Sequence, residues 1–293
     1  MKPILAAAAV ALAFAALGIA LPATAAPISI VAAENVYGEA VTAIGGDRVA
    51  VDSVIVAPGV DPHAFEPPPS VAAALAEARI VIVNGAGYDH WVERLLGASD
   101  VPGRRVIDVA GLIGVADGGN PHVWYHPDAM PALARALTAA LVAIDPDGED
   151  GYAARRDDFL DALAPLGEAI AAVRARHAGT AVAATEPVFG HMAAALGLDM
   201  RNRAFQTAIM NETEPAAGDI AAMEDDIRAG RVKVLFYNSQ VEDAFTRGLA
   251  ALAEAAGVPL VGVTETQPAG TTFVEWMLGT VEATGRALGD PSS

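Results

Sequence analysis

The sequence of 293 residues contains no cysteine. This absence excludes disulfides, thiolate metal ligands, cysteine nucleophiles and a cysteine that carries a lipid. A chain of this length must then be stabilised by its hydrophobic core, and 53% of its residues are hydrophobic. The motifs H-E-x-x-H and G-x-S-x-G are also missing, so the sequence lacks two common signatures of hydrolases.

Basic and aromatic residues are scarce as well. The chain has 18 Lys and Arg residues against 36 Asp and Glu residues, which gives a formal net charge of −18. Nucleic acids and anionic membranes bind clustered basic residues, so neither is expected as a partner. Aromatic residues make up 5% of the chain, which argues against a cleft for an organic ligand.

The first stretch, "MKPILAAAAVALAFAALGIALPATAA", has an early Lys2, a long apolar run, Pro22 and the small-residue triplet Ala23-Thr24-Ala25. This pattern predicts a secretory signal peptide over residues 1–25. The apolar run approaches the roughly 20 residues that span a bilayer, so a membrane anchor is the alternative. Pro22 and the cleavage triplet favour removal. The mature protein is expected to be soluble in the periplasm of a bacterium with two membranes.

Short runs of β-branched residues alternate with Ala-rich stretches of helical pattern over most of the chain. Strands are expected at residues 28–34, 49–57, 78–87, 104–110, 180–186, 231–240 and 258–265. Helices are expected between them, including one over "SVAAALAEA" that Ser70 is suited to cap. The alternation predicts the α/β fold class, with parallel sheets covered on both faces.

The middle of the chain departs from this alternation. Residues 152–177 form one long amphipathic pattern, in which Pro165 is expected to produce a kink. This helix is expected to join two α/β lobes. The predicted division is a signal peptide at 1–25, an N-terminal lobe at 26–146, a linker helix at 147–178 and a C-terminal lobe at 179–293. Ligands of open parallel sheets bind beyond the carboxyl ends of the strands, so a site is expected in a cleft between the lobes.

Four residues with metal-binding side chains follow predicted strands or loops. His63 lies in the proline-rich "DPHAFEPPPS", His122 in "NPHVWYHPDAM", Glu186 at the end of "AVAATE" and Glu265 at the end of "VPLVGVTE". Each one alone is explained by a solvated histidine, a helix N-terminal acid or a surface carboxylate. Two come from each predicted lobe, however. Two imidazoles and two carboxylates in one cleft would form a site for a first-row divalent metal.

The order of these motifs resembles that of the periplasmic solute-binding proteins of zinc and manganese ABC transporters. "DPHAFEPPPS" resembles the first metal-histidine motif of that family, D-P-H-x-[FY]-E-x-x-P-S. "NPHVWYHP" resembles the second, D-P-H-x-W-x-[DN]-P, with Asn120 and His126 as departures. "NGAGYDHW" is similar to a structural segment of the family, and "ATEPVFGHMAAALGL" to the block around its third ligand. The resemblance covers nearly the whole chain after the signal peptide.

This resemblance implies that His63, His122, Glu186 and Glu265 bind one divalent ion. Zinc-type members usually have a histidine at the position of Glu186, whereas some manganese-type members have a glutamate. A carboxylate-rich site suits Mn²⁺, and Zn²⁺ prefers four tetrahedral ligands, so Mn²⁺ is expected ahead of Zn²⁺.

Some assignments stay open. The family usually has an aspartate as its fourth ligand. Glu265 is the nearest match, with Asp243 or Glu242 as the fallback. The remaining histidines are expected next to the ligands or on the surface (His126 and His191), or in structural or solvated positions (His90 and His177).

The implied function is capture of a metal ion in the periplasm and its delivery to the permease and ATPase subunits of an ABC importer. The protein is then a monomer and not an enzyme. One alternative is a periplasmic metallochaperone or storage protein. The other is a secreted zinc hydrolase, which would need an open metal position and a general base, although all four candidates are already assigned as ligands.

Overall fold

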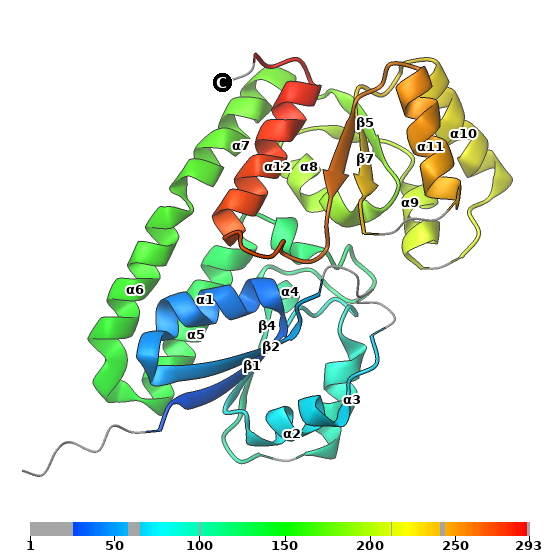
Figure 1. Ribbon diagram of the computed structural model, residues 1–293. Helices are drawn as coiled ribbons and strands as arrows, with labels where there is room; N and C mark the ends of the chain where they lie inside the picture. The colour runs from blue at the N-terminus through cyan, green and yellow to red at the C-terminus, as the bar shows by residue number, and fades with distance from the viewer. Residues whose placement is uncertain (1–25, 58–64, 100, 212, 241–243, 292–293) are drawn as a thin grey trace, which may run out of the picture.

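The structure is a computed structural model of the chain and describes residues 26–57, 65–99, 101–211, 213–240 and 244–291. It contains two four-stranded sheets, and all paired strands in both are parallel. The two sheets lie at opposite ends of the molecule and are joined along one side by a bent helix (Figure 1). The predicted two-lobe α/β fold is therefore confirmed. The predicted signal peptide at 1–25 lies outside the described residues. Among those described, no helix combines the length and the apolar character needed to cross a membrane.

The first sheet has the strand order β2-β1-β3-β4. Its strands are β1 (Ile28–Glu34), β2 (Val49–Ile55), β3 (Ile80–Val83) and β4 (Arg105–Asp108). Its helices are α1 (Asn35–Gly45), α2 (Pro69–Glu77), α3 (His90–Ala98), α4 (Val109–Leu112) and α5 (Ala129–Ile144), with short 3-10 turns η1 (Gly46–Arg48), η2 (Val123–Tyr125) and η3 (Pro146–Gly148). Because β1 and β3 are central, their side chains are buried on both faces of the sheet.

The second sheet has the order β6-β5-β7-β8. Its strands are β5 (Ala181–Ala184), β6 (Asp199–Met200), β7 (Leu235–Asn238) and β8 (Leu260–Val263). The helices around it are α8 (Gly190–Ala195), α9 (Arg203–Met210), α10 (Ala217–Arg228), α11 (Ala244–Ala255) and α12 (Phe273–Ala287). The 3-10 turn η4 (Pro187–Phe189) directly precedes α8. All seven predicted strands are present within their predicted ranges. The two-residue β6 is too short for a hydrophobic pattern and was not predicted.

Two local predictions were wrong. Ser70 does not cap α2, because the helix already begins at Pro69 and no side chain accepts a capping hydrogen bond there. The predicted strand at 104–110 ends at Asp108, whose carboxylate accepts a hydrogen bond from the amide of Gly111 at 2.9 Å. This N-cap starts α4 and terminates the strand, since a capping carboxylate satisfies an amide that would otherwise have no partner at the start of a helix.

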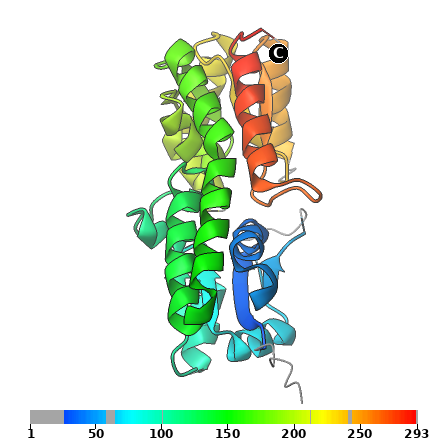
Figure 2. The same ribbon diagram turned by 90° about the vertical axis from the view of Figure 1, so that its left-hand side faces the viewer.

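The linker is a long bent helix made of two helical segments. Helix α6 (Glu149–Ala162) ends before Leu163, and α7 (Ala164–His177) begins directly after it. The break lies next to Pro165, which has no amide hydrogen and whose ring obstructs the preceding helical turn. The two helical segments together run beside both lobes (Figure 2), so the predicted long linker with a kink at Pro165 is confirmed.

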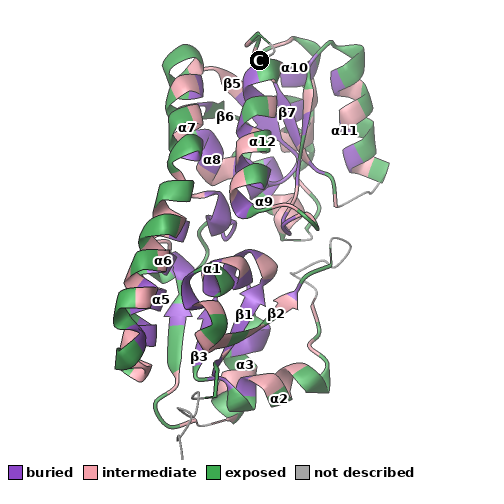
Figure 3. Cartoon of the chain, turned by 60° about the vertical axis from the view of Figure 1, so that its left-hand side comes forward, coloured by how far each residue is buried: buried purple, intermediate pink, exposed green. Residues whose placement is uncertain are grey.

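One hydrophobic core extends through both lobes and the linker. Tyr125, from the N-terminal half, packs its ring 5.5 Å from that of Phe189 and 5.6 Å from that of Trp276, measured between centroids. Its hydroxyl donates to the carbonyl of Thr264 at 3.0 Å. Buried residues therefore continue across the junction of the lobes (Figure 3), and large hinge motion would require this core to separate.

Two glycines near this linker give a direct test of its helical geometry. Gly167 lies within α7, and a Cβ there would meet no atom within 4 Å. We expect Gly167→Ala to raise the free energy of unfolding by about 0.5–1 kcal/mol, because Ala restricts the unfolded chain and favours the helix. Gly179 has equally open space but a φ of +81°. Gly179→Ala is therefore expected to lower stability by about 1–2 kcal/mol. Urea denaturation of both variants compares these opposite effects, and a loss of stability in Gly167→Ala would contradict the helical assignment.

Candidate metal centre

The imidazole of His122 is oriented by Asn120. His122 is fully buried just before η2, and its Nδ1 lies 2.7 Å from Oδ1 of Asn120. The Asn120 amide nitrogen donates to the carbonyl of Pro187 at 2.7 Å, which fixes the side chain with its oxygen toward the imidazole. Nδ1 must therefore donate the proton, and Nε2 then carries the lone pair. A metal-binding histidine has this tautomer, with its second nitrogen bonded to a neighbouring acceptor.

Glu265 approaches the same imidazole from the opposite lobe. It follows β8 and is 5% exposed. Its Oε2 lies 3.6 Å from Nε2 of His122 and accepts a hydrogen bond from the hydroxyl of Tyr88 at 2.9 Å. Burial raises the pKa of Tyr88 well above its usual value, and the nearby charges of Glu265 and Glu34 raise it further. The phenol therefore stays protonated and donates to the carboxylate.

Glu186 is placed beside Glu265 by a shared hydrogen-bond donor. It follows β5 in an extended conformation and is 6% exposed. The side-chain amide of Asn238, at the end of β7, donates to Glu186 at 3.2 Å and to Glu265 at 2.7 Å. One buried amide therefore holds the two carboxylates on the same side of the sheet. Sequence analysis missed Asn238, although its polar side chain at the end of a buried strand was a usable indication.

The other predicted ligand and both fallback residues lie outside the described residues. These are His63, Glu242 and Asp243. Within the described ranges, no three His, Asp or Glu side chains lie close enough together to hold a metal ion. The described part of the structure thus places His122 against Glu265, and Glu265 next to Glu186, with Asn238 between the two carboxylates.

The remaining histidines take indirect or peripheral positions. Nε2 of His191 lies 2.8 Å from the carbonyl oxygen of Asn120, and burial lowers the pKa of this imidazole. His191 thus supports the loop that orients His122. The ring of His126 lies 5.4 Å from that of His191. His90 is exposed, and Nε2 of His177 lies 2.8 Å from Oδ1 of Asp290.

Aromatic rings form a wall behind the imidazole. The ring of Trp124 lies 5.4 Å from that of His122, and the ring of Tyr88 lies 6.1 Å from it and 5.1 Å from Trp124. All three side chains are buried. Such a wall restricts the imidazole to one orientation and excludes water from that side, which strengthens electrostatic interactions within the site.

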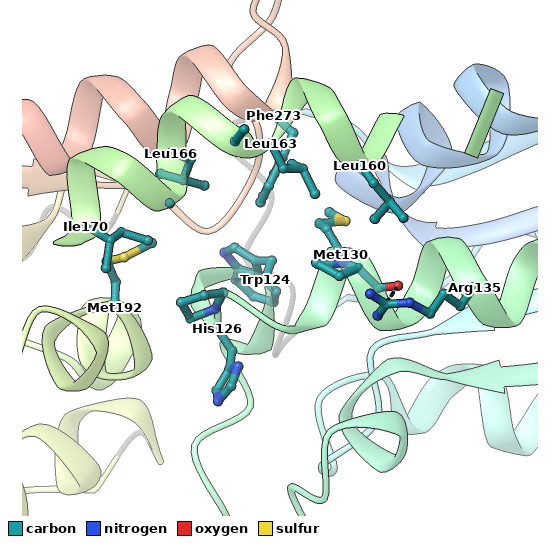
Figure 4. Close-up of a pocket in the computed structure, with 14 residues that line it drawn as sticks. Trp124, His126, Met130, Arg135, Leu160, Leu163, Leu166, Ile170, Met192 and Phe273 are labelled. Atoms are coloured by element: carbon teal, nitrogen blue, oxygen red, sulfur yellow. Dashed lines mark hydrogen bonds between the residues drawn. The ribbon is translucent and has the colours of Figure 1, made fainter. Parts of the chain in front are cut away.

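A cavity lined in part by Trp124 lies next to the kink in the linker. It has a volume of about 310 Å³, and its lining includes Met130, Leu163, Leu166 and Met192. Figure 4 shows these apolar side chains around the cavity, with the Trp124 ring beside them. No Asp or Glu is among the described residues that line it. This cavity lacks the hard oxygen donors that a divalent metal site needs.

Comparison with known structures agrees with this fold. A structure of the periplasmic zinc-binding protein TroA from Treponema pallidum superposes with a TM-score of 0.75 at 20% identity, covering 89% of this chain and 99% of that one. A manganese-bound periplasmic metal-binding protein of Candidatus Liberibacter asiaticus, a point mutant, gives a TM-score of 0.74 at 16% identity, covering 88% and 98%. The chain therefore shares the two-lobe fold of these two structures.

The sequence itself identifies the family. The model of the ZnuA family, zinc-uptake complex component A, periplasmic, matches residues 30–287, and the chain belongs to this family. The manganese-binding lipoprotein MntA of Halalkalibacterium halodurans is 25% identical over 269 residues, which cover 87% of this chain and 86% of that protein. The resemblance stated from the sequence motifs is therefore confirmed.

Proposed function

We propose that this protein binds a divalent transition metal ion, Mn²⁺ ahead of Zn²⁺, and delivers it to an ABC importer. The observation that carries the proposal is the approach of His122 to Glu265 from opposite lobes, with Glu186 sharing a hydrogen-bond donor with Glu265. His122 directs Nε2 toward Glu265 at 3.6 Å, and Asn238 holds Glu265 beside Glu186. The relatives bear names that describe manganese-binding and zinc-binding proteins, which supports a metal ion as the cargo.

The full ligand set in this proposal is His63, His122, Glu186 and Glu265. The ion would replace the interactions that the amide of Asn238 now makes with the two carboxylates, because a carboxylate oxygen binds a divalent ion more strongly than a neutral amide. Two carboxylates neutralise the charge of the ion and compensate for its lost hydration. They can also bind through both oxygens, which suits the higher coordination number of Mn²⁺.

The proposal includes the cellular setting. Residues 1–25 act as a signal peptide that is removed on export, and the mature protein is a periplasmic monomer. The loaded protein docks on the permease, and ATP hydrolysis by the partner subunit drives import. The family is a substrate-binding component rather than a catalytic one, which supports a role without catalysis.

The direct test is to purify the protein from the native periplasm without chelators and measure its bound metals by elemental analysis. We expect about one equivalent of manganese or zinc, and a competition titration to give the relative affinities. Metal-free protein that also fails to bind Mn²⁺ or Zn²⁺ in titration would contradict the proposal. A metallochaperone would bind the metal but would not bind the cognate permease.

Metal removal provides a further prediction. A ligand that binds only the folded state at 1,000 times its Kd stabilises it by roughly 4 kcal/mol. In a chain of this size that corresponds to an increase of about 10 °C in Tm. We expect this shift on adding excess Mn²⁺ and its reversal with EDTA, measured by differential scanning calorimetry. Mg²⁺ at the same concentration is the control, and an equal shift with Mg²⁺ would argue against a transition-metal site.

A further inference from the structure

The segment between β8 and α12, which carries Glu265, is bonded to both lobes. Within its own lobe, the side-chain oxygen of Gln240 accepts hydrogen bonds from the backbone amides of Glu265 and Thr266. On its other side the segment lies over α1, the first helix of the N-terminal lobe (Figures 1 and 2). The position of Glu265 therefore depends on contacts from the opposite lobe as well as from its own.

Two polar residues of α1 make these contacts. Asn35 and Glu39 are four residues apart, so they lie on the same side of the helix. The side chain of Asn35 donates to the carbonyl of Gln267 at 3.0 Å and accepts from its backbone amide at 3.3 Å. The carboxylate of Glu39 accepts from the side-chain amide of Gln267 and, at 2.8 Å, from the backbone amide of Phe273. We call these hydrogen bonds of Asn35 and Glu39 the α1 clasp.

The turn that the α1 clasp holds is bonded internally. Gln267 is 8% exposed, and its side-chain amide also donates to the carbonyl of Thr271 at 2.7 Å. The hydroxyl of Thr271 donates to the carbonyl of Pro268 at 2.8 Å. The turn from Gln267 to the start of α12 is thus fixed as one unit. Glu265 lies two residues before it, so the place of this unit sets where the Glu265 side chain begins.

Glu39 provides the stronger half of the α1 clasp. Hydrogen bonds to an ionised carboxylate are about twice as strong as those between neutral groups. Phe273 is the first residue of α12, and its amide has no acceptor within its own helix. The positive end of the helix dipole also favours a carboxylate at this position. Glu39 therefore joins α1 to the start of α12 across the junction of the lobes.

We propose that Glu39 and Gln267 are positioning residues of the metal centre. The α1 clasp holds the segment of Glu265 against the N-terminal lobe, where Oε2 of Glu265 lies 3.6 Å from Nε2 of His122. This inference rests on the proposed function. Without the α1 clasp, the segment would have to be ordered when the ion binds, and this loss of entropy would lower the affinity.

The test compares Glu39→Ala with Glu39→Gln by isothermal titration calorimetry with Mn²⁺. Both variants remove one negative charge, so both lose the same general attraction for a cation. Only glutamine keeps an oxygen that can accept from Gln267 and Phe273. We expect the Mn²⁺ affinity of Glu39→Ala to fall about tenfold, which is typical for loss of a group that orients a ligand, and Glu39→Gln to recover most of this loss.

A double-mutant cycle then tests the contact itself. Gln267→Ala removes the side chain that donates to Glu39, and it should weaken Mn²⁺ binding by a similar factor. Because both variants break the same contact, the double variant Glu39→Ala/Gln267→Ala should bind little more weakly than the weaker single variant. Glu282→Ala is the control, since it removes an exposed carboxylate of α12 and should bind Mn²⁺ like the wild-type protein.

Hydrogen exchange in EDTA gives a readout that does not depend on metal. The amide of Phe273 should exchange faster in Glu39→Ala than in the wild-type protein or in Glu39→Gln, because it loses its acceptor. Unchanged Mn²⁺ affinity in Glu39→Ala, equal weakening in Glu39→Ala and Glu39→Gln, or additive effects in the cycle would overturn the proposal. Wild-type protein that binds neither Mn²⁺ nor Zn²⁺ would instead refute the proposed function, and unchanged exchange at Phe273 would refute the α1 clasp.

Discussion

Replacement of His122 by alanine is expected to weaken Mn²⁺ and Zn²⁺ binding by more than about 100-fold. Loss of a residue that only supports a metal ligand typically costs roughly 10–100-fold, so loss of a ligand should exceed this range. His122 has the tautomer that a ligand requires, because Asn120 accepts the proton of Nδ1 and leaves Nε2 as the donor atom. Isothermal titration calorimetry with each metal measures the effect.

The matched control for this variant is His90→Ala, because His90 is exposed at the start of α3. It should bind both metals like the wild-type protein. Because His122 is fully buried, His122→Ala leaves a cavity, and a moderate loss of stability is expected. Circular dichroism in EDTA therefore needs to show that the variant is folded at the titration temperature. Tight binding of one equivalent by folded His122→Ala would contradict the site.

Replacement of Glu186 by histidine is expected to change the metal preference. The variant exchanges a hard oxygen donor for an imidazole and removes one negative charge. We expect the ratio of Zn²⁺ to Mn²⁺ affinity to rise by about tenfold or more, since imidazole suits Zn²⁺ and a carboxylate suits Mn²⁺. Competition titration with both ions measures this ratio directly.

Glu186→Gln provides the comparison for this second variant. It removes the charge but keeps the shape of the side chain and an oxygen that can face Asn238. Both affinities should then fall, with a smaller change in their ratio than in Glu186→His. If Glu186→His leaves the ratio unchanged, Glu186 does not bind the ion, and its contact with Asn238 is purely structural.

The sequence predicted the fold well because its strands are strongly patterned. β1 was predicted from Ile28 to Glu34, and the structure gives the same bounds. The errors arose where a local hydrogen bond decides the outcome. Asp108 caps α4 and shortens a strand, and Ser70 lies one residue inside a helix that begins with proline. Such boundaries depend on backbone geometry that a hydrophobic pattern does not record.

The candidate site was predicted less completely. His122, Glu186 and Glu265 could be selected because they are metal-binding residue types at strand or loop ends. Asn238 and Asn120 were not selected, because an amide is not a preferred ligand and its role as a hydrogen-bond partner depends on distance. Asn238 bonds to residues that are 52 and 27 positions away in the sequence. Three-dimensional contacts therefore had to identify the groups that orient the ligands.

Tyr125 links the two halves of the molecule through Phe189, Trp276 and Thr264, and this has a consequence for recognition by the transporter. A receptor whose halves are fastened together has nearly the same outline with and without its cargo. The membrane complex then has little overall shape change by which to reject empty receptors. Under the proposed function, discrimination must instead come from local changes at the candidate metal centre, and an excess of empty receptor should act as a competitive inhibitor of uptake.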